Sequence, residues 1–126
     1  SLHNISIFRF VVFKLWDYDL SDPKKVKDLR VACLSNYAQC LISLKQFETY
    51  ETVVKRCDSA LEINPSHGKT LYRRGIVLMH LNRDKEAEHD LHRTLTLDPT
   101  NSNVQKQLAK LKNKTKQKSS AAPPHQ

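Results

Sequence analysis

The 126-residue sequence contains only two glycines, Gly68 and Gly75. A phosphate-binding loop needs several glycines in close succession, so a nucleotide site of that kind is excluded. Metalloprotease, serine-hydrolase and paired-carboxylate patterns are also absent, and we expect no catalytic residue and no cofactor. With no Asn-Gly or Asp-Gly hairpin signal, the sequence predicts essentially no β-strand.

Cysteine and histidine are too few to indicate a disulfide framework or a metal site. The three cysteines, Cys33, Cys40 and Cys57, form no CxxC pair, and three thiols cannot all be bridged within one chain. We interpret them as buried structural thiols in a reducing, cytoplasmic compartment. His89 and His92 lie three residues apart without an obvious third ligand, so we expect no bound metal.

Long hydrophobic runs are absent as well. The most apolar stretch, residues 5–16, is too short to cross a membrane, and Arg9 and Lys14 interrupt it. We expect a helix at about 4–17 that is apolar on two sides and that drives homo-oligomerisation through residues 5–16. The sequence begins at Ser1 rather than Met, which suggests that part of the native chain is missing.

Acidic residues are absent after Asp98, so the C-terminal end is strongly basic. The whole chain has a formal net charge of +8. Six lysines follow Asp98, namely Lys106, Lys110, Lys112, Lys114, Lys116 and Lys118. No aromatic residue lies between them on which bases could stack, so we do not expect nucleic acid as a partner. We interpret the run as a solvated helix end, with a weak polyanion contact as the alternative.

An internal repeat organises the rest of the chain. Three residues return 34 positions later: Leu61, Ile63 and Pro65 recur as Leu95, Leu97 and Pro99. A fixed period of this length is typical of stacked helix-turn-helix units, and 34 residues is the length of the tetratricopeptide repeat. Counted from Gly68, the large and small places of that repeat hold Leu71, Gly75, Leu78, Ala87 and Thr94. Small residues are needed there because two antiparallel helices can approach closely only where side chains are small.

The preceding repeat follows the same pattern with one departure. Its second helix carries Val53, Cys57 and Ala60 at the corresponding places. Its first helix shows an apolar stripe with a period near 3.6 residues, formed by Leu34, Tyr37, Leu41 and Leu44. The connecting segment KQFETYE is about three residues longer than the standard turn, so we expect a longer loop or a longer second helix.

The chain therefore resembles a tetratricopeptide repeat (TPR) protein. More narrowly, RVACLSNYAQCLISL followed by GKTLYRRG is similar to the C-terminal repeat domain of immunophilin co-chaperones. The widened turn with YETV is similar to the small cytosolic tetratricopeptide repeat protein nine family. The resemblance implies an all-α fold whose helix-turn-helix repeats stack into a right-handed superhelix with a C-terminal capping helix.

The repeat register predicts the helices and the organisation of the chain. The expected antiparallel pairs are 28–44 with 50–63, and 68–81 with 84–97. The expected units are the second helix of a truncated first repeat (1–20), a repeat with a widened turn (28–65), a second repeat (68–101), a Lys-rich capping helix (102–118) and a disordered tail (119–126).

The segment HGKTLYRRG places Lys69 one helical turn before Arg73 with no carboxylate between them. Like charges four residues apart repel by roughly a few tenths of a kcal/mol, so an anion from outside the chain would favour this arrangement. In the co-chaperones that the chain resembles, a carboxylate clamp binds the acidic C-terminal tail of heat-shock protein 90 or 70. Matching clamp places hold Asn36, Lys69 and Arg73 here, and the family's remaining two would precede Ser1. Arg74 is expected to point away and to pack its stem along a neighbouring helix.

Two functions of different classes are consistent with these features. The first is a non-catalytic co-chaperone adaptor that binds the acidic C-terminal peptide of heat-shock protein 90 or 70 through a partial carboxylate clamp. The second is a TPR scaffold or self-associating module that binds another helix or peptide in its groove. Because the catalytic domain of immunophilins lies upstream of their repeats, the resemblance implies no isomerase activity here.

Overall fold

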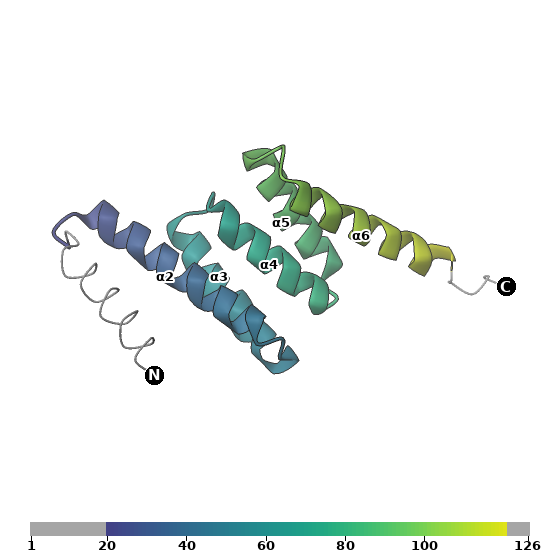
Figure 1. The fold of residues 1–126 in the computed structure, drawn as a ribbon, viewed down its shortest axis with the longest axis horizontal. Coiled ribbons are helices and arrows are strands. Elements are labelled where there is room, and N and C mark those ends of the chain that lie inside the picture. Colours follow the sequence, from purple (N-terminus) through teal and green to yellow (C-terminus); the bar gives the residue numbers. More distant parts are fainter. Residues whose placement is uncertain (1–19, 121–126) are drawn as a thin grey trace, which may run out of the picture.

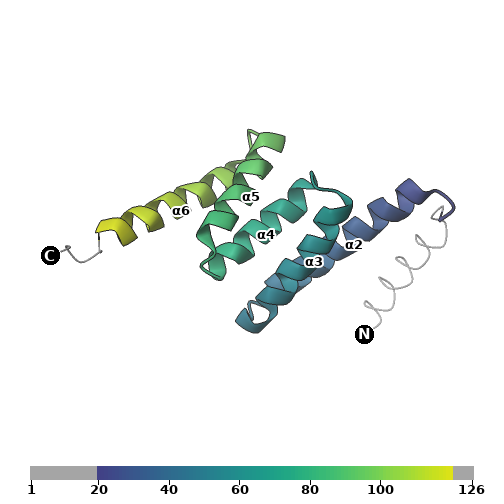
Figure 2. The ribbon, with the colours of Figure 1, turned by 180° about the vertical axis from the view of Figure 1, so that it is seen from behind.

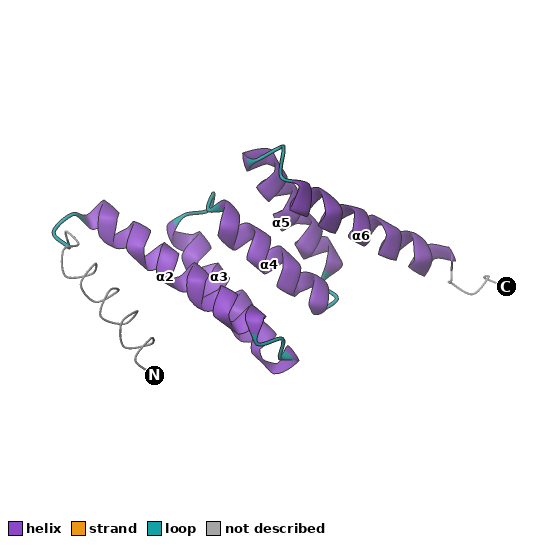
Figure 3. Cartoon of the chain, in the orientation of Figure 1, coloured by secondary structure: helices purple, strands orange, loops and turns teal. Residues whose placement is uncertain are grey.

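The computed structural model describes residues 20–120, and this part of the chain consists of helices joined by turns, without strands (Figures 1 and 3). The helices are α2 (Pro23–Ser43), α3 (Tyr50–Ile63), α4 (Gly68–His80), α5 (Asp84–Leu97) and α6 (Ser102–Ser120), and a 3-10 turn, η1 (Phe47–Thr49), precedes α3. The predicted all-α, TPR-like fold class is confirmed. The helix expected at about 4–17 and the end of the expected tail lie outside the described residues.

The helices are arranged in two layers (Figures 1 and 2). Helix α2 pairs with α3 and α4 pairs with α5, while α3 contacts α4 and α5 contacts α6. The first helices of successive units also contact one another, α2 with α4 and α4 with α6. We call the surface formed by α2, α4 and α6 the first-helix face. Helices α3 and α5 lie behind it (Figures 1 and 2).

Small residues allow α4 and α5 to pack closely, as the repeat register predicted. Leu71 and Ala87 are fully buried, and Gly75 is buried between the helices. A β-carbon added at Gly75 would lie 3.0 Å from both Cγ and Cδ2 of Leu91. Contacts of that length leave no room for a methyl group unless Leu91 moves, and the dense packing of a core opposes such a movement.

Helix α2 buries a different stripe from the predicted one. Its buried residues are Val31, Ser35 and Ala38, whereas Tyr37 is 46% exposed and Leu44 is 57% exposed. Two members of the periodic apolar stripe, Tyr37 and Leu44, therefore lie outside the buried stripe. A stripe chosen by the size of its apolar side chains overlooked Ser35 and Ala38, whose small side chains suit a close approach to the neighbouring helices.

The start of α2 also differs from the predicted one, because the helix begins at Pro23 rather than near residue 28. The Oδ1 atom of Asp22 accepts a hydrogen bond from the backbone nitrogen of Lys24 at 2.9 Å. Proline is favoured in the first turn, where its missing N–H would have no partner in the helix. An acidic cap followed by proline is a start signal that could have been recognised in the sequence.

The two helical pairs use turns of the same kind. The central residue is Lys45 in the first and Asn82 in the second, and both have left-handed backbone angles, with φ of 54° and 59°. The expected extra length of the first turn is present, and it forms η1, Phe47–Thr49, directly ahead of α3. The extra residues lie ahead of α3, so α3 and α5 still begin and end 34 residues apart.

The cysteines divide into two environments. Cys57 is fully buried, as predicted, and burial raises the pKa of its thiol to about 12. Cys33 and Cys40 are exposed on α2, so the prediction that they are buried was wrong. All three thiols are free.

Helix α6 covers the end of the α4–α5 pair. It buries Val104 and Leu111. Its Lys114 extends to the turn between α4 and α5, where its Nζ lies 2.8 Å from Oδ1 of Asn82 and 3.0 Å from Oδ1 of Asp84. Nζ of Lys118 lies 3.5 Å from the second carboxylate oxygen of Asp84. The interpretation of the lysine run as a solvated helix end was therefore incomplete, because two of the lysines attach α6 to the repeat.

Candidate functional site

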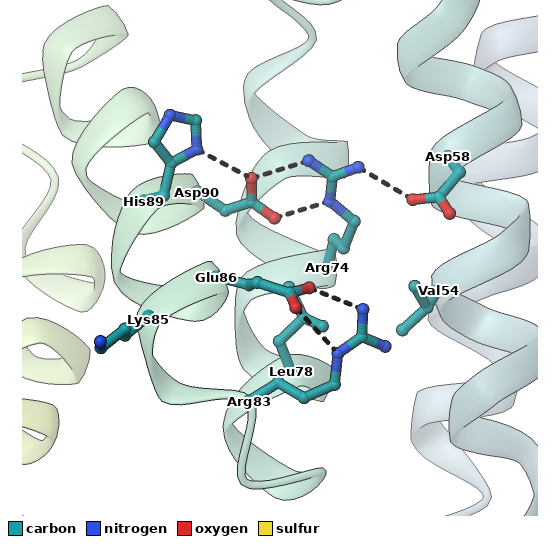
Figure 4. Close-up of a pocket in the computed structure, with 9 residues that line it drawn as sticks. All are labelled: Val54, Asp58, Arg74, Leu78, Arg83, Lys85, Glu86, His89 and Asp90. Atoms are coloured by element: carbon teal, nitrogen blue, oxygen red, sulfur yellow. Dashed lines mark hydrogen bonds and ion pairs between the residues drawn. The ribbon is translucent and has the colours of Figure 1, made fainter.

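Two adjacent arginines on α4 point to opposite sides of the fold. Arg74 points away from the first-helix face, toward α3 and α5 (Figure 4). Its Nε and Nη2 donate to the two carboxylate oxygens of Asp90 at 2.6 and 2.8 Å, and its Nη1 donates to Oδ1 of Asp58 at 2.9 Å. The hydrogen bonds that Arg74 donates to Asp90, opposed by desolvation, raise the pKa of Arg74 above its ordinary value. Since the side chain of Asp90 is only 2% exposed, Arg74 neutralises a buried carboxylate.

A cavity of about 430 Å³ surrounds this ion pair, and its lining residues are drawn in Figure 4. The nearby Arg83 also has a carboxylate partner in the wall, because its Nη2 lies 2.6 Å from Oε2 of Glu86. Both arginines of the cavity are therefore balanced by acidic residues of the chain itself. A cavity with this balance has little electrostatic preference for an anionic ligand.

Arg73 turns toward α2 instead. Its Nη1 donates to the backbone oxygen of Ser35 at 2.8 Å and to the Oγ atom of Ser35 at 2.7 Å. Among residues 20–120, no carboxylate lies within ion-pair distance of Arg73, and its Nε and Nη2 have no hydrogen-bond partner. The guanidinium is anchored by neutral atoms only, so its charge is not compensated by this part of the chain.

The structure brings Arg73 next to the helical turn that carries Asn36. Asn36 directly follows Ser35, the residue to which Arg73 binds, and it is exposed. Asn36 and Arg73 also occupy equivalent places, since each lies seven residues before the last residue of its helix, Ser43 or His80. This equivalence places both residues on the first-helix face.

Lys69 lies one turn before Arg73 but borders a different part of this surface. It is exposed, and it lines a shallow cavity of about 300 Å³ between α4 and the junction of α5 and α6. Asp98 lines the same cavity, yet Lys69 forms no ion pair with it or with any other described carboxylate. Arg73 is thus directed toward α2, whereas Lys69 borders the cavity near the α5–α6 turn, and the two cations do not converge on a common partner within residues 20–120.

His67 borders this positively charged region, and the sequence analysis did not identify it. Its Nδ1 lies 2.7 Å from Oγ1 of the buried Thr70 at the start of α4. Burial lowers the pKa of His67, and the positive charges of Arg73 and Lys69 lower it further. The N-terminus of a helix carries partial positive charge as well. The position of His67 immediately before α4 was the signal that could have identified it.

The described residues offer no competing metal or membrane site. No group of three or more His, Cys, Asp or Glu side chains within 20–120 could hold a metal ion. None of the helices in this part of the chain is long and apolar enough to span a bilayer. His89 and His92 each face an acidic neighbour, Asp90 at 3.9 Å and Glu88 at 3.5 Å, rather than each other.

The sequence is similar to segments of longer proteins, although no protein-family profile matches it. It is 37% identical over 76 residues to the meiotically up-regulated gene 93 protein of Schizosaccharomyces pombe. The aligned segment covers 60% of this chain and 20% of that protein. It is 35% identical over 82 residues to the human FK506-binding protein-like protein, and this aligned segment covers 65% of this chain and 23% of that protein. The chain thus matches no more than about a quarter of the length of these relatives.

Solved structures share the fold. The C-terminal TPR-containing domain of a Plasmodium falciparum FK506-binding protein superposes with a TM-score of 0.70 at 24% identity, over 82% of this chain and 68% of that one. The first TPR of Spaghetti (RPAP3), solved with the HSP90 peptide SRMEEVD bound, gives 0.62 at 28% identity, over 68% of this chain and 65% of that one. The first TPR domain of human RPAP3 gives 0.65 at 27% identity, over 74% and 71%.

Proposed function

We propose that the chain is a TPR protein-interaction module that binds the acidic C-terminal peptide of heat-shock protein 90 or 70, because it resembles the C-terminal TPR-containing domain of an FK506-binding protein and the first TPR of RPAP3. In this proposal Arg73 and Lys69 bind carboxylates of the peptide, and Asn36 binds its terminal carboxylate or backbone. The peptide would lie across the first-helix face, so that it meets Asn36 on α2 and then the two cations of α4.

The contrast between neighbouring cations carries the proposal. Arg74 is held by two carboxylates of the chain, whereas Arg73 and Lys69 have none among the described residues. A cation that has no carboxylate partner gains most when an external anion approaches. Arg73 keeps Nε and Nη2 available, which is the edge that binds a carboxylate through two parallel hydrogen bonds.

The similarity to the first TPR of Spaghetti (RPAP3) supports the choice of ligand, because that structure contains an HSP90 peptide ending in Glu-Glu-Val-Asp. Such a peptide carries several carboxylates within a few residues, including its own C-terminus. A partial clamp of three residues can bind part of this charge, and each charge-assisted hydrogen bond contributes about 1.5–3 kcal/mol. We therefore expect measurable affinity that falls steeply as the salt concentration rises.

Titration calorimetry with the pentapeptide Met-Glu-Glu-Val-Asp tests this proposal. The informative control is the same peptide with an amidated C-terminus, which removes one negative charge and changes nothing else in the sequence. We expect amidation to weaken binding by about tenfold, corresponding to roughly 1.4 kcal/mol. Equal affinities for the two peptides, or no binding of either, would contradict a carboxylate clamp.

A second candidate function is a scaffold that binds an apolar helix or a second copy of the chain. Five of the six exposed large hydrophobic residues in the described part lie between residues 20 and 47: Leu20, Val26, Tyr37, Leu44 and Phe47. Exposed apolar side chains concentrated in one part of the chain favour association with another apolar element. Sedimentation velocity over a range of concentrations tests this function, and a strictly monomeric species throughout would argue against self-association. The predicted contribution of residues 5–16 lies outside the described residues and remains a prediction.

A further inference from the structure

Ser35 is a polar side chain buried within α2, with only 1% of its surface exposed. A hydroxyl that has lost its hydrogen bonds to water needs a partner inside the protein. Arg73 supplies one, because its Nη1 lies 2.7 Å from Oγ and 2.8 Å from the backbone oxygen of Ser35. These two bonds join α2 to α4 across 38 positions of sequence.

The bonds also restrict the guanidinium of Arg73. An unrestrained arginine side chain samples many rotamers, and a ligand that immobilises it must overcome that loss of entropy. Two acceptors on one terminal nitrogen hold the group in a fixed orientation before any ligand arrives, which is preorganisation. The plane of the guanidinium then determines where its Nε and Nη2 point, and these two donors have no partner within residues 20–120.

We propose that Ser35 is a positioning residue for anion binding, which fixes Nη1 of Arg73 and thereby presents the Nε and Nη2 edge to a peptide carboxylate beside Asn36. This inference rests on the proposed function, since it assigns to a buried residue the task of orienting a ligand-binding cation. Ser35 itself does not touch the ligand. Its contribution to affinity therefore exists only while Arg73 is present.

A double-mutant cycle tests this dependence. Ser35→Ala removes Oγ but leaves the backbone oxygen, and it is measured both in the parent chain and in the Arg73→Ala variant. We expect Ser35→Ala to weaken binding of Met-Glu-Glu-Val-Asp about fivefold in the parent and by less than about twofold in the Arg73→Ala background. Ser43→Ala is the matched control, because Ser43 lies on the same helix and its Oγ bonds only within α2, to Gln39. It should leave affinity unchanged.

Two outcomes of the cycle would overturn the inference. Equal losses in the two backgrounds would mean that Ser35 acts through packing and not through Arg73. An unchanged affinity of Ser35→Ala in the parent would mean that the guanidinium needs no positioning.

A second measurement on the free chain separates this inference from the proposed function. Nitrogen NMR relaxation of the Arg73 Nε–H group should report greater mobility after Ser35→Ala, while the Arg74 signal should not change. If the parent chain fails to bind the peptide, the proposed function is wrong. The positioning of Arg73 by Ser35 is then tested by the relaxation of the Arg73 Nε–H group alone. An Arg73 guanidinium that stays equally ordered without Oγ of Ser35 would refute it.

Discussion

Replacing Arg74 by alanine should mainly lower stability, whereas replacing Arg73 by alanine should mainly weaken peptide binding. Arg74→Ala leaves the carboxylate of Asp90, which is only 2% exposed, without its two strongest hydrogen bonds. Removing one partner of a buried ion pair typically costs about 3–5 kcal/mol. Arg74 is itself 21% exposed and its second partner, Asp58, is 51% exposed, so we expect the lower end of that range, about 3 kcal/mol.

Arg73→Ala should change stability far less. It removes two hydrogen bonds to neutral atoms of Ser35 and leaves one buried hydroxyl without its partner, a loss of about 1 kcal/mol. The same substitution should weaken binding of the acidic peptide at least tenfold, because it removes the charge that we assign to the ligand. Asn36→Ala should weaken binding by a smaller factor, since it removes a neutral partner.

Urea unfolding followed by far-UV circular dichroism gives the stabilities, and calorimetry with Met-Glu-Glu-Val-Asp gives the affinities. Affinities are compared under conditions in which each variant is fully folded, so that unfolding of Arg74→Ala is not mistaken for lost binding. If Arg74→Ala weakened binding as much as Arg73→Ala, the assignment of the two arginines to opposite sides of α4 would be functionally wrong. Equal losses of stability would refute the structural part of the reasoning.

Three further predictions concern thiol reactivity, pH and packing. Iodoacetamide followed by mass spectrometry should modify Cys33 and Cys40 readily in the folded chain, whereas Cys57, whose pKa is raised to about 12, should react only after unfolding; early modification of Cys57 would contradict its burial. The lowered pKa of His67 should rise when an anionic peptide neutralises its cationic neighbours, so peptide affinity should increase from about pH 8 to about pH 6, and His67→Gln should abolish this pH dependence. Without ligand, the lowered pKa makes the stability of the folded chain fall as the pH drops through the unfolded-state pKa of His67 and then through its folded-state pKa. Gly75→Ala should lower the free energy of unfolding by about 1 kcal/mol, because overpacking against a buried leucine on α5 outweighs the gain in helix propensity, and a more stable variant in urea would show that α5 can move.

The repeat was predictable from sequence because its signals are local and periodic. The bounds of α3 and α5, at 50–63 and 84–97, are those that the 34-residue register predicted. The same register identified Gly75 and Ala87 as contact positions, since close helix packing requires small side chains wherever it occurs. The prediction for α2 was poorer, because its buried stripe includes Ser35, a polar residue that hydrophobic periodicity passes over.

The candidate site was predictable in part. The sequence placed Asn36, Lys69 and Arg73 in register, and successive residues of a helix point about 100° apart, so the divergence of Arg73 and Arg74 could be anticipated. Their partners could not be. The two aspartates that hold Arg74 lie 16 positions away on either side, and Ser35 lies 38 positions from Arg73.

The sequence by itself therefore determined the helical repeat, its register and the positions of the charged residues on each helix. Only the tertiary structure decided which of those charges are neutralised within the described chain. The physical reason is distance dependence: an ion pair or hydrogen bond forms only when two groups come within a few ångströms, and between different helices that proximity is set by how the helices pack. Packing supplies Arg74 with two carboxylates and Arg73 with a buried serine, and so leaves one of two adjacent arginines with an uncompensated charge on the first-helix face.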